Sequence, residues 1–106
     1  MVYKIKVNDE MSIIIHSKSG CPFCDKAKLF LESKNISYKE IHYDTSMENY
    51  EILKNELMTS TKQNTFPQIF VGDVFVGGYT QLIHSFDSCQ FHEWCSQIGL
   101  LIEADF

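Results

Sequence analysis

The first part of the chain alternates between short β-branched runs and a segment with helical periodicity. Residues 12–16 form a β-branched run, which predicts a buried strand. Residues 21–35 repeat apolar side chains at helical spacing, and Pro22 stands at the first helical position, where its missing N–H costs nothing. Residues 37–43 alternate at period two and predict a second strand. This order demands parallel pairing of the two strands through a right-handed crossover.

The middle of the chain predicts a second helix and a hairpin. The apolar face of that helix is marked by Met47, Tyr50, Leu53 and Leu57. Residues 68–71 and 74–76 are short apolar strands. Gly72 and Asp73 join them as a two-residue hairpin loop, which predicts antiparallel pairing.

Two more helices are predicted after the glycine pair at positions 77 and 78. A short helix is expected over residues 80–86. The last helix places four side chains on one face: Phe91, Trp94, Cys95 and Ile98. We expect Asp87 or Ser88 to cap it. The resulting order, β-α-β-α-β-β-α-α, predicts a mixed sheet with helices on both faces.

Length and composition predict a single domain over residues 1–106. This length is too short for two domains, and 44% hydrophobic residues supply a core. Residues 2–7 alternate at period two and fit either an additional N-terminal strand or a frayed terminus. The net charge of −5 argues against a non-specific nucleic-acid binder.

The four cysteines raise the question of redox compartment. Residues 1–10 lack the apolar core of a secretory signal, and no apolar run is long enough to span a membrane. We therefore expect a cytoplasmic protein without a membrane partner. Cytosolic cysteines stay reduced unless they carry out chemistry, so the position of each cysteine decides its role.

Cys21 and Cys24 form a Cys-x-x-Cys pair at the junction of the first predicted strand and helix. Cys21 falls at the helix N-cap, where backbone N–H groups lack intrahelical acceptors. Those donors and the helix dipole favour the thiolate, which is both the nucleophile and the better leaving group. Residues 18–28 contain three lysines against one aspartate, and this local charge favours the thiolate further. Cys24, one turn into the helix, is close enough to attack a mixed disulfide on Cys21.

Two other interpretations of the pair are less well supported. A structural zinc site usually has a second closely spaced pair of ligands, whereas five residues separate Cys89 from Cys95. Two inert buried cysteines are disfavoured by Pro22 between them and by the flanking lysines. Cys95, on the apolar face of the last helix, is expected in the core. For Cys89 an exposed, oxidisable thiol is the less favoured alternative to a structural role.

Three motifs resemble those of the glutaredoxin family in order and spacing. They are residues 18–24 (Lys-Ser-Gly-Cys-Pro-Phe-Cys), 65–67 (Thr-Phe-Pro) and 77–80 (Gly-Gly-Tyr-Thr). The resemblance covers residues 12–100 and is specific because all three motifs occur together. It implies an α/β protein with a thioredoxin-like fold, in which a four-stranded mixed sheet is flanked by helices.

The resemblance also implies roles for individual residues. Cys21 is similar to the family's nucleophile and Cys24 to its resolving thiol. Pro67 corresponds to a cis-proline that faces the active site. Glutathione is the implied co-substrate, and no metal is expected. Nine residues are implied to bind glutathione: Lys18, Phe23, Thr65, Phe66, Pro67, Gly78, Tyr79, Thr80 and Gln81.

Different parts of glutathione are expected to meet different residues. By resemblance, the backbone of Phe66 faces the cysteinyl part, and Lys18 meets the glycine carboxylate. Residues 78–80 open a helix whose free N–H groups suit the γ-glutamyl carboxylate. Lys54 is a further candidate for the glycine carboxylate, on helix register alone.

The sequence departs from the family pattern at two positions. Gln81 stands where many members have aspartate, which predicts weaker recognition of the α-amino group of glutathione. Phe23 stands where tyrosine is common, so a hydroxyl is missing. Neither departure is expected to change the fold.

The implied function is that of a monomeric, glutathione-dependent thiol–disulfide oxidoreductase in electron transport. Its expected substrates are protein disulfides and glutathionylated proteins, with ribonucleotide reductase as a candidate partner. One alternative is an iron–sulfur cluster carrier that uses Cys21 and glutathione as ligands across a dimer, which the Cys-Pro-Phe-Cys sequence disfavours. The other is a thioredoxin-like donor served by a flavin-dependent reductase. The absence of tryptophan before Cys21, with Lys18 and the glycine pair present, disfavours that alternative.

Overall fold

The computed structural model describes residues 12–100 and confirms the predicted order of elements. The elements are β1 (Ile13–Lys18), α1 (Pro22–Ser33), β2 (Lys39–Tyr43), α2 (Tyr50–Thr61), β3 (Gln68–Val71), β4 (Val74–Gly77), α3 (Tyr79–Asp87) and α4 (Gln90–Gln97). The predicted strand over residues 2–7 lies outside the described residues, and the single domain over residues 1–106 stays a prediction. Within residues 12–100, no helix combines the length and the apolar character that crossing a bilayer requires.

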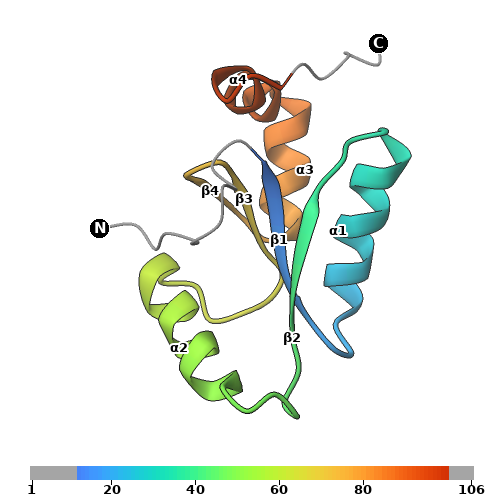
Figure 1. The fold of residues 1–106 in the computed structure, drawn as a ribbon. Coiled ribbons are helices and arrows are strands. Elements are labelled where there is room, and N and C mark those ends of the chain that lie inside the picture. The colour runs from blue at the N-terminus through green and yellow to red at the C-terminus, as the bar shows by residue number, and fades with distance from the viewer. Residues whose placement is uncertain (1–11, 101–106) are drawn as a thin grey trace.

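The four strands form one mixed sheet, as predicted, and their order in the sheet is β2-β1-β3-β4. β1 pairs with β2 in parallel, and with β3 antiparallel. β3 and β4 form the predicted antiparallel hairpin. Figure 1 shows α1 and α3 on one side of the sheet and α2 on the other. β1 is therefore an interior strand that is covered on both faces, which explains its continuous apolar sequence.

Alternate side chains of β1 enter two different apolar clusters. Ile13 and Ile15 join the larger cluster, in which α1, α3 and α4 pack on the sheet around Leu31, Leu82 and Phe91. The smaller cluster lies under α2 and consists of Tyr43, Tyr50, Leu57 and Phe70. The ring of His16 contacts this second cluster, with ring centroids 5.8 Å from Tyr43 and 5.4 Å from Phe70.

The predictions for the starts of α2 and α4 differ from the structure. Met47 precedes α2, because the Asp44 carboxylate accepts a hydrogen bond from the Ser46 N–H (3.0 Å) and turns the chain before the helix. Neither Asp87 nor Ser88 caps α4. Asp87 is the last residue of α3, and the Ser88 N–H completes that helix by donating to the His84 carbonyl at 3.0 Å. Cys89 is the N-cap of α4 instead, with no capping bond from its side chain.

His16 is a titratable group buried in the interior. Its side chain is 0% exposed, and Nδ1 lies 2.9 Å from the Tyr43 hydroxyl. Nε2 has no hydrogen-bond partner among the described residues. Burial lowers the pKa of His16 from 6.5 to about 4, because the charged imidazolium is poorly solvated there.

We expect the protein to lose stability as the pH falls from 6.5 to about 4, because the unfolded His16 binds a proton over this range and the folded one does not. The shift corresponds to roughly 3 kcal/mol of unfolding free energy. His16→Phe should remove this part of the pH dependence while keeping the aromatic contacts. Urea unfolding of both proteins at several pH values measures the difference. Carboxylates titrate in both proteins, so some loss of stability at low pH is expected in each. If the unfolding free energy of the wild type falls no more steeply with decreasing pH than that of His16→Phe, the assignment is contradicted.

Candidate active site

Cys21 is placed at the N-terminus of α1 by the end of β1 and one turn. Gly20 takes a left-handed conformation (φ 68), which turns the chain from the strand toward the helix. Cys21 itself is extended and is the N-cap residue, and Pro22 follows it at the start of the helix. The Cys24 N–H donates to Cys21 Sγ at 3.1 Å. Cys21 is therefore the N-cap of α1, as the sequence predicted, and its sulfur accepts a hydrogen bond from one N–H of the first helical turn.

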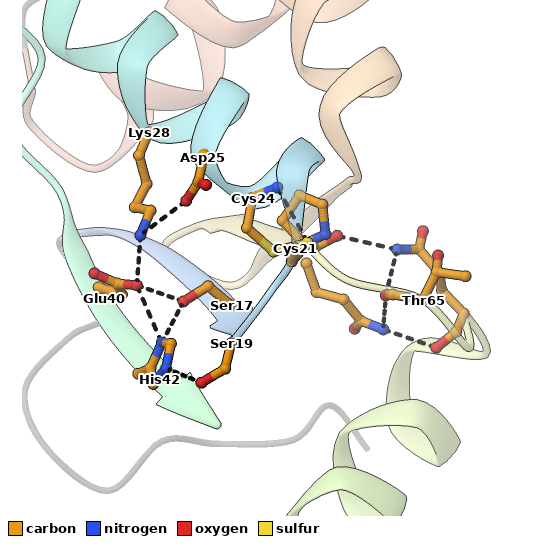
Figure 2. Close-up of a disulfide and its surroundings, with 12 residues drawn as sticks. Ser17, Ser19, Cys21, Cys24, Asp25, Lys28, Glu40, His42 and Thr65 are labelled. Atoms are coloured by element: carbon orange, nitrogen blue, oxygen red, sulfur yellow. Dashed lines mark hydrogen bonds and ion pairs between the residues drawn. A yellow bond between two sulfur atoms is a disulfide. The ribbon is translucent and has the colours of Figure 1, made fainter. Parts of the chain in front are cut away.

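Cys21 and Cys24 form a disulfide, and their Cα atoms are 5.2 Å apart. Figure 2 shows the pair at the start of the helix. Cys21 is 9% exposed and Cys24 is 1% exposed. Cys24 belongs to the buried face of α1, together with Ala27 and Leu31. The pair is thus asymmetric, because Cys21 is the more exposed residue and Cys24 lies on the buried face of the helix.

The peptide bond between Phe66 and Pro67 is cis, as the family resemblance implied. Side-chain amides hold this loop in place. Gln63 Nε2 donates to the carbonyls of Thr65 (3.1 Å) and Pro67 (3.2 Å). Gln68 Nε2 donates to the Thr65 carbonyl at 3.1 Å and to the Gln63 carbonyl at 2.7 Å. None of these four bonds uses the backbone of Phe66.

Gln63 and Gln68 were not predicted as site residues. Gln68 is 0% exposed, and its Oε1 accepts a hydrogen bond from the Thr61 hydroxyl at 2.7 Å. A signal was present in the sequence, since a glutamine inside an otherwise apolar strand needs internal partners. Those partners, however, lie on a loop whose path the sequence pattern did not show.

Gly78 is the N-cap of α3, which begins at Tyr79, one residue before the predicted start. The Gly78 N–H donates to Gln81 Oε1 at 2.9 Å, so the side chain of Gln81 folds back over the helix N-terminus. A Cβ atom at Gly77 would lie 2.8 Å from Cγ of Gln81. At Gly78 a Cβ atom would lie 3.5 Å from the Pro67 carbonyl oxygen, so this glycine adjoins the cis-proline loop.

A cavity of about 450 Å³ lies between α2 and the loop before β3. Its lining includes Lys18, Lys54, Thr65 and Phe66, four of the residues that the sequence associated with glutathione. The other lining residues are Tyr50, Asn55, Met58 and Asn64. No carboxylate is among these lining residues, but Lys54 forms an ion pair at 3.7 Å with Glu51, whose side chain is 72% exposed. Because water screens so exposed a pair, the ammonium groups of Lys18 and Lys54 still make the cavity suitable for an anion.

The remaining predicted residues lie outside this cavity lining. The rings of Phe23 and Tyr79 meet with centroids 6.0 Å apart. The Lys26 ammonium lies 5.1 Å from the centroid of Phe23 and 6.0 Å from that of Tyr79. Phe23 is 53% exposed, so this aromatic pair forms part of the surface next to the disulfide.

The two other cysteines are not paired with each other. Cys95 is buried in the core as predicted, and burial raises the pKa of its thiol to about 11. Cys89 is exposed, which was the less favoured interpretation. Among residues 12–100, no group of three or more His, Cys, Asp or Glu side chains is arranged to hold a metal ion.

The fold and the site define a class of protein. A thioredoxin-like sheet, a Cys-x-x-Cys disulfide at a helix N-terminus and a cis-proline before β3 are the features of a thioredoxin-fold oxidoreductase with a redox-active cysteine pair. The family model for glutaredoxin matches residues 13–76. The chain belongs to the glutaredoxin family, whose members are thiol–disulfide oxidoreductases.

Individual relatives agree with this assignment. The chain is 39% identical to glutaredoxin 1 of Rickettsia bellii over 72 residues, which is 67% of this chain and 72% of the relative. It is 34% identical to a glutaredoxin of Pseudomonas aeruginosa over 70 residues, covering 66% and 79% of the two chains.

Solved structures agree with the fold. A glutaredoxin from Brucella melitensis matches with a TM-score of 0.68 and 32% identity, over 85% of this chain and 94% of that one. A buckwheat glutaredoxin–glutathione complex matches with a TM-score of 0.76 over 85% of this chain and 81% of that one. At 19% identity the buckwheat protein supports the fold only.

We expect the four thiols of the reduced protein to alkylate in a fixed order. Cys21 should react first at neutral pH, because the helix N-terminus favours its thiolate. The exposed Cys89 should follow, whereas the buried Cys24 and Cys95 should react slowly. Iodoacetamide labelling followed by peptide mass spectrometry measures the four rates. Faster labelling of Cys24 than of Cys21 would contradict the asymmetry of the site.

Proposed function

We propose that the protein is a glutathione-dependent oxidoreductase that reduces protein disulfides and glutathione mixed disulfides. One combined observation carries the proposal: the Cys21–Cys24 pair occurs with an anion-suited cavity that shares Phe66 with the cis-proline loop. The pair supplies the redox chemistry, and the cavity supplies recognition of a small carboxylate-bearing thiol. A monomeric state and a reducing compartment such as the cytoplasm are part of the same proposal.

In the monothiol route, the Cys21 thiolate attacks the glutathione sulfur of a mixed disulfide. The substrate sulfur leaves as a thiolate and takes a proton from water, and Cys21 becomes bonded to glutathione. The thiolate of a second glutathione then attacks the glutathione sulfur in this bond. The products are oxidised glutathione and the Cys21 thiolate, which the N-terminus of α1 stabilises as a leaving group.

In the dithiol route, Cys21 first forms a mixed disulfide with a protein substrate. Cys24 loses its proton and attacks Cys21, which forms the disulfide seen in the structure and releases the reduced substrate. Two glutathione molecules restore the two thiols and leave as oxidised glutathione. Cys24 is one helical turn from Cys21, so it needs no rearrangement of the fold to reach it.

The proposed glutathione site extends from the cavity to the N-terminus of α3. Lys18 and Lys54 would pair with the glycine carboxylate, because both line the cavity. The backbone of Phe66 would pair with the cysteinyl part. The N–H groups of residues 78–80 would receive the γ-glutamyl carboxylate, although the Gly78 N–H already donates to Gln81. Thr65, Pro67 and Phe23 would contribute contacts around the sulfur.

Substitution of Cys21 and of Cys24 should have different effects on activity, and this difference tests the glutathione-dependent mechanism. Cys21→Ser should abolish all activity, since no nucleophile remains. Cys24→Ser should keep reduction of a small glutathione mixed disulfide but lose most reduction of protein disulfides. The assay couples glutathione and glutathione reductase to each substrate.

Thioredoxin reductase in place of the glutathione system is the control, and it should support little turnover. Equal loss of mixed-disulfide reduction in Cys24→Ser and Cys21→Ser would rule out the monothiol route. Visible absorption after anaerobic cluster reconstitution would instead favour the iron–sulfur carrier. Assays with glutathionylated or disulfide-bonded proteins, ribonucleotide reductase among them, would identify the protein partners.

We expect Gln81→Asp to lower the apparent Michaelis constant for glutathione about fivefold, or ~1 kcal/mol, because a carboxylate can pair with the ligand's ammonium. Gln81→Asn is the matched control, since it shortens the side chain equally without adding charge. Steady-state kinetics of the three proteins measure the effect. A Michaelis constant that is unchanged or raised in Gln81→Asp would show that position 81 does not face the ligand's amino group.

A further inference from the structure

A cluster of charged and polar side chains lies beside the disulfide, between β1, β2 and α1 (Figure 2). Lys28 Nζ forms an ion pair with Glu40 Oε2 at 3.0 Å. The Ser17 hydroxyl donates to the same carboxylate oxygen, and His42 Nδ1 lies 3.5 Å from it. The Ser19 hydroxyl lies 3.0 Å from His42 Nε2. The proposed glutathione-binding residues are not part of this cluster.

The cluster lies next to Cys24 for two reasons. Lys28 follows Cys24 by four residues in α1, and residues at this spacing are neighbours on one face of a helix. Ser17 is fully buried and continues the β1 face of Ile13 and Ile15, against which the buried face of α1 packs. Lys28 is therefore one helical turn from the resolving Cys24, and its ion pair brings Glu40 of β2 to the same helix.

The charges of the pair are shielded from water in part. The side chains of Lys28 and Glu40 are 23% and 30% exposed. The hydrogen bond from Ser17 and then the Lys28 ammonium hold the pKa of Glu40 below its ordinary value, so this side chain is a carboxylate at neutral pH. Partly shielded charges act on a neighbouring group more strongly than fully solvated ones.

We propose that Lys28 and Glu40 are positioning residues that set the ionisation of Cys24. The proposal rests on the dithiol route of the proposed function, in which Cys24 must lose its proton to water before it attacks Cys21. The Lys28 ammonium favours the Cys24 thiolate, and the Glu40 carboxylate opposes it. Their pairing keeps the net field at the sulfur small, so that Cys24 stays a thiol until the mixed disulfide has formed.

Other charged groups around Cys24 are less suited to this role. Asp25, on the same helix, is 3.8 Å from Lys28 Nζ, but its side chain is 72% exposed and is screened by water. On β2, His42 contacts Glu40 and carries charge only when protonated. Asp44, beyond β2, is bound to Ser46 and Ser19. α3 also packs on α1, and it contributes the phenol of Tyr79, which lies under Lys26.

The closing experiment follows the reaction of the reduced protein with Ellman's reagent by stopped flow. Cys21 attacks the aromatic disulfide and releases one thionitrobenzoate, and attack by Cys24 on the mixed disulfide then releases the second. All proteins carry Cys89→Ser, so that the exposed Cys89 thiol does not contribute. The rate of the first thionitrobenzoate release reports the reactivity of Cys21. The rate of the second release is measured as a function of pH, and the midpoint of that dependence reports the ionisation of Cys24.

The two single variants should shift that midpoint in opposite directions. Lys28→Gln leaves the carboxylate unpaired and should raise the midpoint by about half a pH unit. Glu40→Gln leaves the ammonium unpaired and should lower it by about the same amount. The rate of the second phase at neutral pH should change only about twofold in either variant, because a thiolate that forms more easily is also a weaker nucleophile. The double variant should return toward the wild-type midpoint.

Two controls separate charge from structure. Lys28→Arg keeps the charge and should keep the wild-type midpoint. Glu32→Gln removes a carboxylate from the same helix eight residues beyond Cys24, about 12 Å along the axis, and should change little at an ionic strength of about 0.1 M. Shifts of the same sign in Lys28→Gln and Glu40→Gln, or no shift in either, would overturn the inference. A wild-type protein that lacks the second phase would instead overturn the dithiol route of the proposed function.

Discussion

The pairing of β1 with strands on both of its sides is the constraint on which the rest of the structure depends. Parallel pairing with β2 and antiparallel pairing with β3 fix the end of β1 in the middle of the sheet. The cysteine pair follows that end after one turn, so its position is set by the sheet and by α1 together. β3 begins at the residue after the cis-proline, so the same pairing holds the loop of Phe66 and Pro67.

The sequence predicted those parts of the fold that depend on local interactions. The β-branched run of β1, the proline that opens α1 and the two-residue hairpin loop are each specified within a few residues. The starts of α2 and α4 were predicted wrongly, because competing local bonds ended or delayed the neighbouring elements. The motifs located the cysteines and the cis-proline. Gln63, Gln68 and Tyr50 were missed as site residues, because their roles depend on tertiary contacts.

The cis-proline loop shows how buried polar groups serve a binding surface. A buried glutamine is favourable only if its amide is fully bonded, and Gln68 uses both its oxygen and its nitrogen within the protein. Gln63 donates to two carbonyls of the loop. The amides therefore hold the loop through Thr65 and Pro67, on either side of Phe66. In the proposed site, this arrangement leaves the Phe66 backbone for the substrate.

The two sulfurs of one disulfide have different surroundings, and this difference suits the order in which they would act. Cys21 Sγ accepts a hydrogen bond from the Cys24 N–H at the helix N-terminus, a position that favours the charged form of a thiol, and Cys21 is the more exposed of the two residues. Cys24 lies on the buried face of α1, one helical turn from Lys28 of the Lys28–Glu40 ion pair. An isolated ammonium there would favour a thiolate before it was needed and would weaken it as a nucleophile, since nucleophilicity falls with the pKa of a thiol. An isolated carboxylate there would disfavour the thiolate when it is needed. A paired ammonium and carboxylate avoids both outcomes.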